Sequence, residues 1–311
     1  MKTDATGREI GKNPASPSGL PPAIAAYLIW GFLPLYLILV QVVPAFEFVG
    51  WRIIWTLPFC LLIVALRKQG KELLVAVKDP RSLAILTASA LLIGINWLVY
   101  VWAIQADQVY AASLGYYINP LLNVLLGTLL LGEKLSKLQW LAVAVAAIGV
   151  AILAAGALTT LWISLTLAFS FGTYGLLRKR VAVGSLPGLT IESAILLLPA
   201  TGIVLYYGQL PSGSAFGAEL WLSVAIMLGG VLTAVPLLLF AIAARRMEYS
   251  TIGFIQFLAP TIVFLLGIFV FNEDLKPAQL ACFTLIWIAL ALFVLDLWQR
   301  RPKKQKSVAR I

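Results

Sequence analysis

Polar side chains inside long apolar stretches are the residues of this chain whose types and spacing could do chemistry. Asn96 and Tyr100 are four residues apart and Ser113 and Tyr116 are three apart, so each pair shares one helix face. Because hydrocarbon offers such groups no hydrogen-bond partners, they are expected either to bond between helices or to line a cavity. The candidates for solute contact are Tyr27, Trp30, Arg52, Asn96, Tyr100, Ser113, Tyr116, Tyr117, Asn119, Asn123, Tyr174, Thr233 and Gln256. They predict an amphipathic, largely uncharged cavity for neutral or zwitterionic solutes with an aromatic or apolar body.

Two charged residues lie within the apolar stretches. Arg52 is expected either to reach outward to Glu47 or Asp107, or to meet a carboxylate or another anion of a solute. Glu192 is the candidate proton carrier, and it is expected on the other side of the membrane midplane from Arg52. No acidic residue falls at the centre of an apolar stretch, so facilitated or exchange transport fits the sequence as well as proton antiport does.

Metal and enzyme chemistry have little support in the sequence. The chain has no histidine, the commonest metal ligand and proton shuttle. Its two cysteines, Cys60 and Cys282, fall inside apolar runs and are expected to be small buried hydrophobes. Paired carboxylates, a metal cluster and an activated nucleophile are not visible, so we expect neither a cofactor nor catalysis.

The elements that must position these residues are predicted from composition. The chain of 311 residues is 61% hydrophobic and only 12% charged, which is too little polar surface to cover a soluble domain. Its apolar runs are long enough to cross about 30 Å of hydrocarbon as helices. We therefore predict an all-α polytopic membrane protein with ten spans, at 20–40, 46–66, 82–105, 109–131, 138–155, 160–177, 188–208, 219–243, 249–271 and 278–298.

The basic residues predict the orientation of these spans. If both termini are cytoplasmic, nearly all of the 23 Lys and Arg residues fall inside, the exceptions being Arg52 and Lys276. The net charge of +10 is therefore read as a topology signal rather than as nucleic-acid binding. Residues 1–19 are expected to be a disordered cytoplasmic tail and 299–311 a basic cytoplasmic tail.

A repeat divides the chain into two halves. The pattern Pro-x4-Leu-Leu-Gly-x5-Glu-x-Leu-x3-Gln begins at Pro120 and again at Pro260. It predicts two five-helix units, 20–155 and 160–298. Because five is odd, the second unit enters the membrane from the opposite side, as in the inverted repeats of secondary transporters. We expect the solute site near the midplane between the halves, and Pro120 and Pro260 as paired gating kinks.

Longer strings of the sequence resemble a known family. The strings are Asn96-Trp97 through Trp102-Ala103, Ala112 to Leu121, Gly132-Glu133, Thr233 to Leu237, Ala244-Arg245-Arg246 and Ser250 to Phe254. They resemble the RarD-type branch of the EamA drug/metabolite transporter superfamily. The resemblance implies ten helices as two inverted five-helix repeats in a bacterial inner membrane, and export or exchange of small molecules. One departure is Ala111, where the family pattern leads us to expect an acidic residue.

The sequence therefore favours a secondary exporter or exchanger of small amphipathic metabolites, amino-acid-like solutes or drugs. A solute channel and, with less support, a polytopic membrane enzyme acting on a lipid-linked substrate remain alternatives. The expected partners are the lipid bilayer and a small-molecule solute, not nucleic acid, and the expected assembly is a monomer or a weak homodimer.

Overall fold

The computed structural model describes residues 18–272 and 275–299, and this part of the chain is built from helices. The α-helices are α1 (Leu20–Leu37), α2 (Ala45–Leu66), α3 (Gly70–Lys78), α4 (Pro80–Gln105), α5 (Val109–Leu131), α6 (Lys137–Ala154), α7 (Leu161–Arg180), α8 (Ser185–Gly208), α9 (Leu220–Arg246), α10 (Tyr249–Gln256), α11 (Leu258–Phe269) and α12 (Pro277–Gln299). Two short 3-10 segments are η1 (Ile38–Val40) and η2 (Ala155–Thr160). Ten stretches are long and apolar enough to cross a membrane, with α10 and α11 forming one of them. The predicted all-helical fold with ten spans is confirmed.

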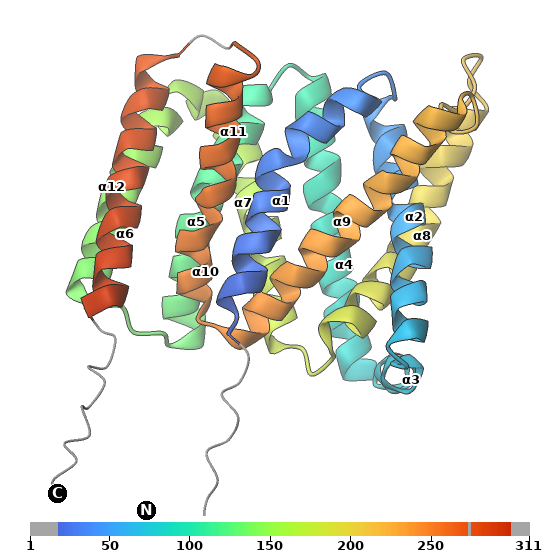
Figure 1. Cartoon of the computed structure of the whole chain (residues 1–311), viewed down its shortest axis with the longest axis horizontal. Helices are drawn as coiled ribbons and strands as arrows, with labels where there is room; N and C mark the ends of the chain where they lie inside the picture. The colour runs from blue at the N-terminus through green and yellow to red at the C-terminus, as the bar shows by residue number, and fades with distance from the viewer. Residues whose placement is uncertain (1–17, 273–274, 300–311) are drawn as a thin grey trace, which may run out of the picture.

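Consecutive spans run in opposite directions across the bundle (Figure 1). We call the end where α1 begins and α12 ends the terminal end. The connection from α5 to α6 lies at the terminal end, whereas α11 ends and α12 begins at the opposite end. The two copies of the repeated sequence pattern therefore run across the bundle in opposite senses, which is consistent with the predicted inversion.

Helix packing relates the two halves pair by pair. Three contacts join equivalent helices of the two units: α2 with α8, α5 with α10, and α6 with α12. Several other contacts occur in matched pairs: α1 packs on α9 as α4 does on α7, α2 on α9 as α4 on α8, and α1 on α11 as α5 on α7. Exchanging the halves thus returns these contacts, whereas the packing of α7 on α9 and of α5 on α6 has no equivalent of the same extent.

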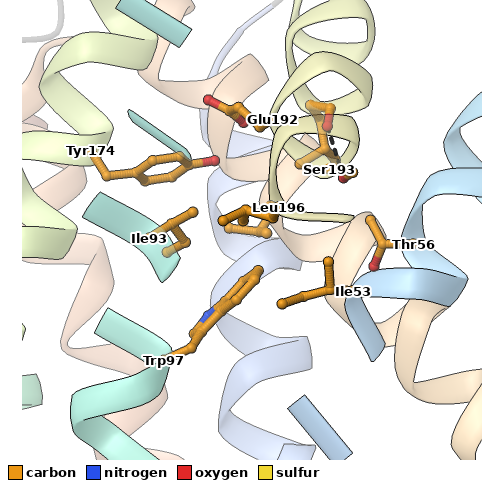
Figure 2. Close-up of a pocket in the computed structure, with 10 residues that line it drawn as sticks. Ile53, Thr56, Ile93, Trp97, Tyr174, Glu192, Ser193 and Leu196 are labelled. Carbon is orange, nitrogen blue, oxygen red and sulfur yellow. Dashed lines mark hydrogen bonds between the residues drawn. The ribbon is translucent and has the colours of Figure 1, made fainter. Parts of the chain in front are cut away.

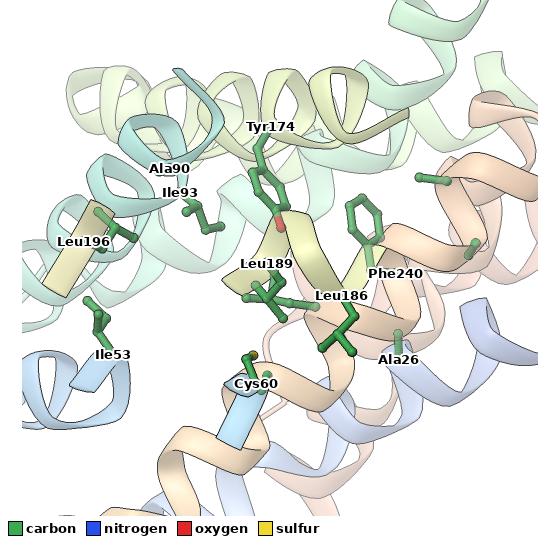
Figure 3. Close-up of a cluster of buried hydrophobic side chains, with 14 of the residues drawn as sticks. Ala26, Ile53, Cys60, Ala90, Ile93, Tyr174, Leu186, Leu189, Leu196 and Phe240 are labelled. Carbon is green, nitrogen blue, oxygen red and sulfur yellow. The ribbon is translucent and has the colours of Figure 1, made fainter. Parts of the chain in front are cut away.

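The main apolar core lies where the halves meet (Figure 3). It brings Tyr174 of α7 and Phe240 of α9 together with Ile93 of α4 and with Leu189 and Leu196 of α8, all at least nine-tenths buried. The bundle is tight enough here to require glycine. A Cβ on Gly230 of α9 would come within 2.6 Å of the carbonyl carbon of Trp55 in α2.

Two predicted boundaries differ from the structure. The connection predicted at 67–81 contains α3, whose Leu73 and Ala76 pack on Val181, Val183 and Ile191 because their spacing forms one apolar face. The sixth span was predicted to end at residue 177, but α7 continues to Arg180. This extension carries Arg178 into the bundle, where its side chain is fully buried.

The two repeat-equivalent prolines act differently on their helices. Pro120 lies inside α5, which stays continuous from Val109 to Leu131. At Pro260 the span is interrupted at Phe257, between α10 and α11. A proline removes one backbone hydrogen-bond donor, and a helix can either continue past it, as α5 does, or be interrupted near it, as between α10 and α11. The two halves thus adopt unequal conformations at equivalent positions.

Candidate functional site

A cavity of about 250 Å³ lies between helices of both halves. Of the residues predicted to contact solute, those that line it are Tyr27, Trp30, Arg52, Asn96, Tyr100, Ser113, Tyr116, Tyr117, Asn119, Thr233 and Gln256. Asn123 and Tyr174 are not among its lining residues. Pro260 lines the cavity, and Pro120 does not. The polar spacing in the sequence therefore identified most of the polar side chains that line this cavity.

The cavity extends from the middle of the bundle toward the opposite end. Its lining includes Arg52, eight residues into α2, and Tyr36, near the end of α1. Tyr27 and Gln256 lie deeper, toward the middle of their spans. Further lining residues that the sequence analysis did not select are Tyr36, Phe48, Trp97 and Phe171. Trp97 could have been found, because it directly follows Asn96 in the sequence.

Arg52 is the charged group of this cavity. Its guanidinium carbon lies 4.6 Å from the centre of the Trp97 ring, within the range of a cation–π contact. Within the described residues it forms no ion pair, so pairing with Glu47 or Asp107 is not observed. Glu47 instead accepts hydrogen bonds from Trp51 Nε1, Ser214 Oγ and the Ala215 amide.

Buried amides form the floor of the cavity. Gln256 Oε1 accepts from Asn123 Nδ2 at 2.6 Å and from the Tyr27 hydroxyl at 3.3 Å. Gln256 Nε2 donates to Asn119 Oδ1 at 2.5 Å, and Asn119 Nδ2 donates to the Ala168 carbonyl at 2.7 Å. These bonds tie α1, α5, α7 and α10 together. Of the two expectations for polar groups in the spans, hydrogen bonding between helices is therefore the one observed for these side chains.

Other polar side chains of the cavity divide into bonded and free groups. Asn96 Nδ2 donates to the Leu167 carbonyl and to Ser170 Oγ, both at 2.9 Å. Thr233 donates within its own helix, to the Gly229 carbonyl. By contrast, the hydroxyls of Tyr100, Ser113 and Tyr116 form no hydrogen bond with other described residues. These three hydroxyls are therefore available to a solute.

Glu192 lies beside a second, much smaller cavity of about 10 Å³ (Figure 2), room for one water at most. The Arg178 Nη1 and Glu192 Oε1 atoms are 3.6 Å apart, and Ser89 donates a hydrogen bond to the same carboxylate. Glu192 thus pairs with Arg178, which the predicted spans place in a connection because the sixth span was expected to end at residue 177. Trp97 lines both cavities and so stands between Arg52 and the Glu192 pair.

A carboxylate closes the terminal end below the cavity. Glu133, in the α5–α6 connection, accepts the backbone N–H groups of Tyr249 at 2.7 Å and Ser250 at 2.8 Å, which open α10. Lys179 Nζ lies 3.9 Å from the same carboxylate. Gly127 leaves the necessary room, since a Cβ there would be 2.6 Å from Glu133 Oε2. The repeated Gly and Glu of the sequence pattern therefore form a clamp in the first half.

No group of three or more potential metal ligands occurs in the described part of the chain. The chemistry of the main cavity is thus that of one guanidinium, several hydroxyls and an aromatic wall. Such a set can bind and orient a solute.

Comparison with known proteins gives consistent results. Residues 17–155 match the EamA-like transporter family. The chain is 44% identical to an uncharacterized transporter of Pseudomonas aeruginosa, over 89% of this chain and 93% of that protein. It is 40% identical to Protein RarD of Escherichia coli K12, over 92% and 97% respectively. Chloramphenicol-sensitive protein RarD of Pseudomonas aeruginosa is 29% identical, over 89% and 93%.

The fold also matches a solved structure. A protein chain of known crystal structure superposes with a TM-score of 0.70 at 21% identity, covering 90% of this chain and 99% of the other. At that identity the match supports the fold and nothing finer.

Proposed function

Because the chain belongs to the EamA-like transporter family, in its RarD-type branch, we propose that it is a secondary transporter that moves small amphipathic solutes by alternating access. Amino-acid-like solutes, other metabolites and drugs are the candidate cargo, and export or exchange is the proposed direction. The chain is a multi-pass membrane protein of the drug/metabolite transporter superfamily.

The observation that carries this proposal is the position of the main cavity. It lies between helices of both halves, begins near the middle of the bundle and extends toward one end only. At the other end the Glu133 clamp and the amide floor hold α5 against α10. A site between two halves, closed on one side, is the arrangement expected of one state of an alternating carrier.

The unequal prolines suggest how the second state is reached. We propose that the two units are inverted repeats and that they exchange conformations, with Pro120 and Pro260 as gating hinges. The interruption at Phe257 lets α10 move separately from α11. Gly253 of α10 packs on the Pro120 carbonyl of α5, where a Cβ would come within 2.5 Å. Movement at one hinge is therefore transmitted directly to the other.

The distribution of charge supports an orientation. The connections at the terminal end carry Arg67, Lys68, Lys71, Lys134 and Lys137, whereas the described connections at the opposite end carry Lys276. By the positive-inside rule we propose that the terminal end is cytoplasmic in a bacterial inner membrane, with both termini inside. Most of the predicted tails, 1–19 and 299–311, falls outside the described residues, and Gln299 is the last residue of α12. We propose a monomer or a weak homodimer.

Glu192 is our proposed proton carrier. Its carboxylate is buried, and protonation would remove its attraction to Arg178 at 3.6 Å. Trp97 lines both this small cavity and the main cavity, so protonation of Glu192 is coupled to a solute on the Trp97 ring through that side chain. Proton coupling remains one option beside exchange.

The test is counterflow in proteoliposomes, using solutes chosen by a thermal-shift screen of amino acids, nucleobases and amphenicols. The transporter proposal predicts saturable uptake that is accelerated when unlabelled solute is loaded inside the vesicles. Flux without saturation or counterflow would support a channel instead. Chemical conversion of a lipid-linked substrate by the detergent-purified protein would support an enzyme.

A further inference from the structure

We propose that the main cavity binds an organic monoanion, with its carboxylate on the Arg52 guanidinium and its apolar, aromatic body on the ring wall. This inference deepens the proposed function, on which it rests, by assigning a charge class to the solute. The sequence predicted a largely uncharged cavity for neutral or zwitterionic solutes and left open whether Arg52 meets a solute carboxylate, and the surroundings of Arg52 favour that second option.

Arg52 carries the only formal charge among the residues that line the cavity. Every other lining residue that can bond is an amide, a hydroxyl or an indole, so no carboxylate faces the guanidinium across the cavity. Glu47, the acid nearest in sequence, is held by Trp51, Ser214 and Ala215. Within the described residues the charge is therefore uncompensated by any acidic side chain.

The guanidinium also has bonding capacity left over. Its Nε is buried without a hydrogen-bond partner, and no side-chain donor of Arg52 forms a hydrogen bond within the described chain. One face lies on the Trp97 ring at 4.6 Å, which leaves the in-plane N–H groups available. Keeping an arginine without a partner inside a membrane span is costly, so a ligand is the natural partner.

Charge and geometry both select the ligand's head group. A planar fork of N–H donors matches the two oxygens of a carboxylate, and such paired bonds are short and strong. A single cation balances a single negative charge, which favours a monoanion over a phosphate monoester. A free ammonium group would be repelled by Arg52 and would find no carboxylate among the residues that line the cavity.

The other lining residues favour a ligand whose body is apolar and aromatic. Trp30, Trp97, Tyr100 and Tyr116 present rings, and the last two have centroids 5.7 Å apart in an edge-to-face arrangement. The unpartnered hydroxyls of Tyr100, Ser113 and Tyr116 lie among these rings. The volume of about 250 Å³ is at the small end of ligand pockets and fits one molecule of amino-acid size.

The experiment measures binding to the full-length, detergent-purified chain by thermal stabilisation and tryptophan quenching. The probes share one body and differ in charge: 3-phenylpropionate, L-phenylalanine, 3-phenylpropan-1-ol and 3-phenylpropylamine. We expect the anion to bind best and the amine worst, with at least a roughly tenfold difference in Kd, the size expected of one charge-assisted hydrogen bond. The Arg52→Gln variant should lose this preference, and Arg52→Lys should keep part of it.

The matched control is Arg81→Gln, which removes an exposed cation at the terminal end and should leave the preference unchanged. If Arg52→Gln fails to fold, the order of affinity of the parent chain for the four probes, and the weaker preference expected of Arg52→Lys, still test the inference. Equal affinity for all four probes, a preference for the amine, or no binding of the anion up to its solubility limit would overturn the inference.

A second experiment distinguishes binding of a free solute at Arg52 from binding of a lipid head group. Titration with phosphatidylglycerol should not reproduce an Arg52-dependent stabilisation. If it does while 3-phenylpropionate has no effect, Arg52 binds a lipid head group and the inference is wrong. Counterflow of a neutral or cationic solute without any anion binding would sustain the transporter proposal and refute only the charge class.

Discussion

Replacing Glu133 by glutamine should open the terminal end of the bundle. The carboxylate accepts two backbone N–H groups at the start of α10, from Tyr249 at 2.7 Å and Ser250 at 2.8 Å. It also lies 3.9 Å from Lys179 Nζ, with both side chains largely buried. Glutamine keeps the shape and one acceptor oxygen, but it loses the charge and presents an NH2 group to one of the two donors.

The magnitude follows from these contacts. A hydrogen bond to a charged group contributes about 1.5–3 kcal/mol, and Glu133→Gln removes one such bond and weakens the other. The pair with Lys179, whose side chain is 20% exposed and whose Nζ lies 3.9 Å from the carboxylate, adds about 0–1 kcal/mol. We therefore expect the closed arrangement to lose about 3 kcal/mol relative to the open one, a shift of roughly a hundred-fold in their ratio.

Hydrogen exchange measured by mass spectrometry tests this expectation. In Glu133→Gln, peptides covering α10 and the terminal end of α7 should exchange up to about a hundred-fold faster, because exchange there follows the population of the open form. The matched control is Glu72→Gln, at the same end, whose carboxylate is exposed and accepts from Gln69. Exchange of α10 within a factor of about two of the parent chain would refute the clamp.

Three further outcomes are expected. Arg178→Met leaves the buried Glu192 carboxylate without its cation and should cost about 3–5 kcal/mol of stability in thermal unfolding. Adding Glu192→Leu should restore most of this stability. A double variant as unstable as the single one would contradict the pairing. Gly253→Ala should cost about 1–3 kcal/mol in the same assay, because its Cβ would lie 2.5 Å from the Pro120 carbonyl oxygen; an unchanged melting temperature would show that α5 and α10 are not held so closely. Pro260→Ala should slow turnover in proteoliposomes more than it weakens binding, since it restores a backbone donor at the interruption; equal losses would indicate a packing role.

The spans and most of the polar residues of the cavity could be predicted because the membrane makes sequence patterns simple. Long apolar runs have to be helices there, and polar groups within them have to find partners or a cavity. Asn96, Tyr100, Ser113 and Tyr116 were found in this way, and all four line the cavity. The repeated Gly127 and Glu133 were also visible in the sequence, although their use as a clamp on α10 was not.

What the sequence could not show depends on contacts between distant helices. Asn123 Nδ2 donates a hydrogen bond to Gln256 Oε1 across 133 positions, and the polarity of the two residues alone could not reveal that they bond to each other. Arg178 was assigned to a loop because it begins a run of three basic residues, but Gly188 leaves space for its guanidinium inside the bundle. Arg52 has no acidic partner among the described residues, because the Glu47 carboxylate is held by Trp51, Ser214 and Ala215 through its Oε1 atom.

Alternating access itself is tested most directly by labelling one cavity residue from both sides of the membrane. Ser113→Cys, in a chain whose buried Cys60 and Cys282 are replaced by alanine, places a single thiol in the main cavity. A membrane-impermeant thiol reagent is applied to vesicles of either orientation. Alternating access predicts labelling from both faces, and predicts that Glu133→Gln speeds labelling from the terminal end while slowing it from the opposite end. Rates that rise together from both faces, or labelling from one face alone in both chains, would contradict it.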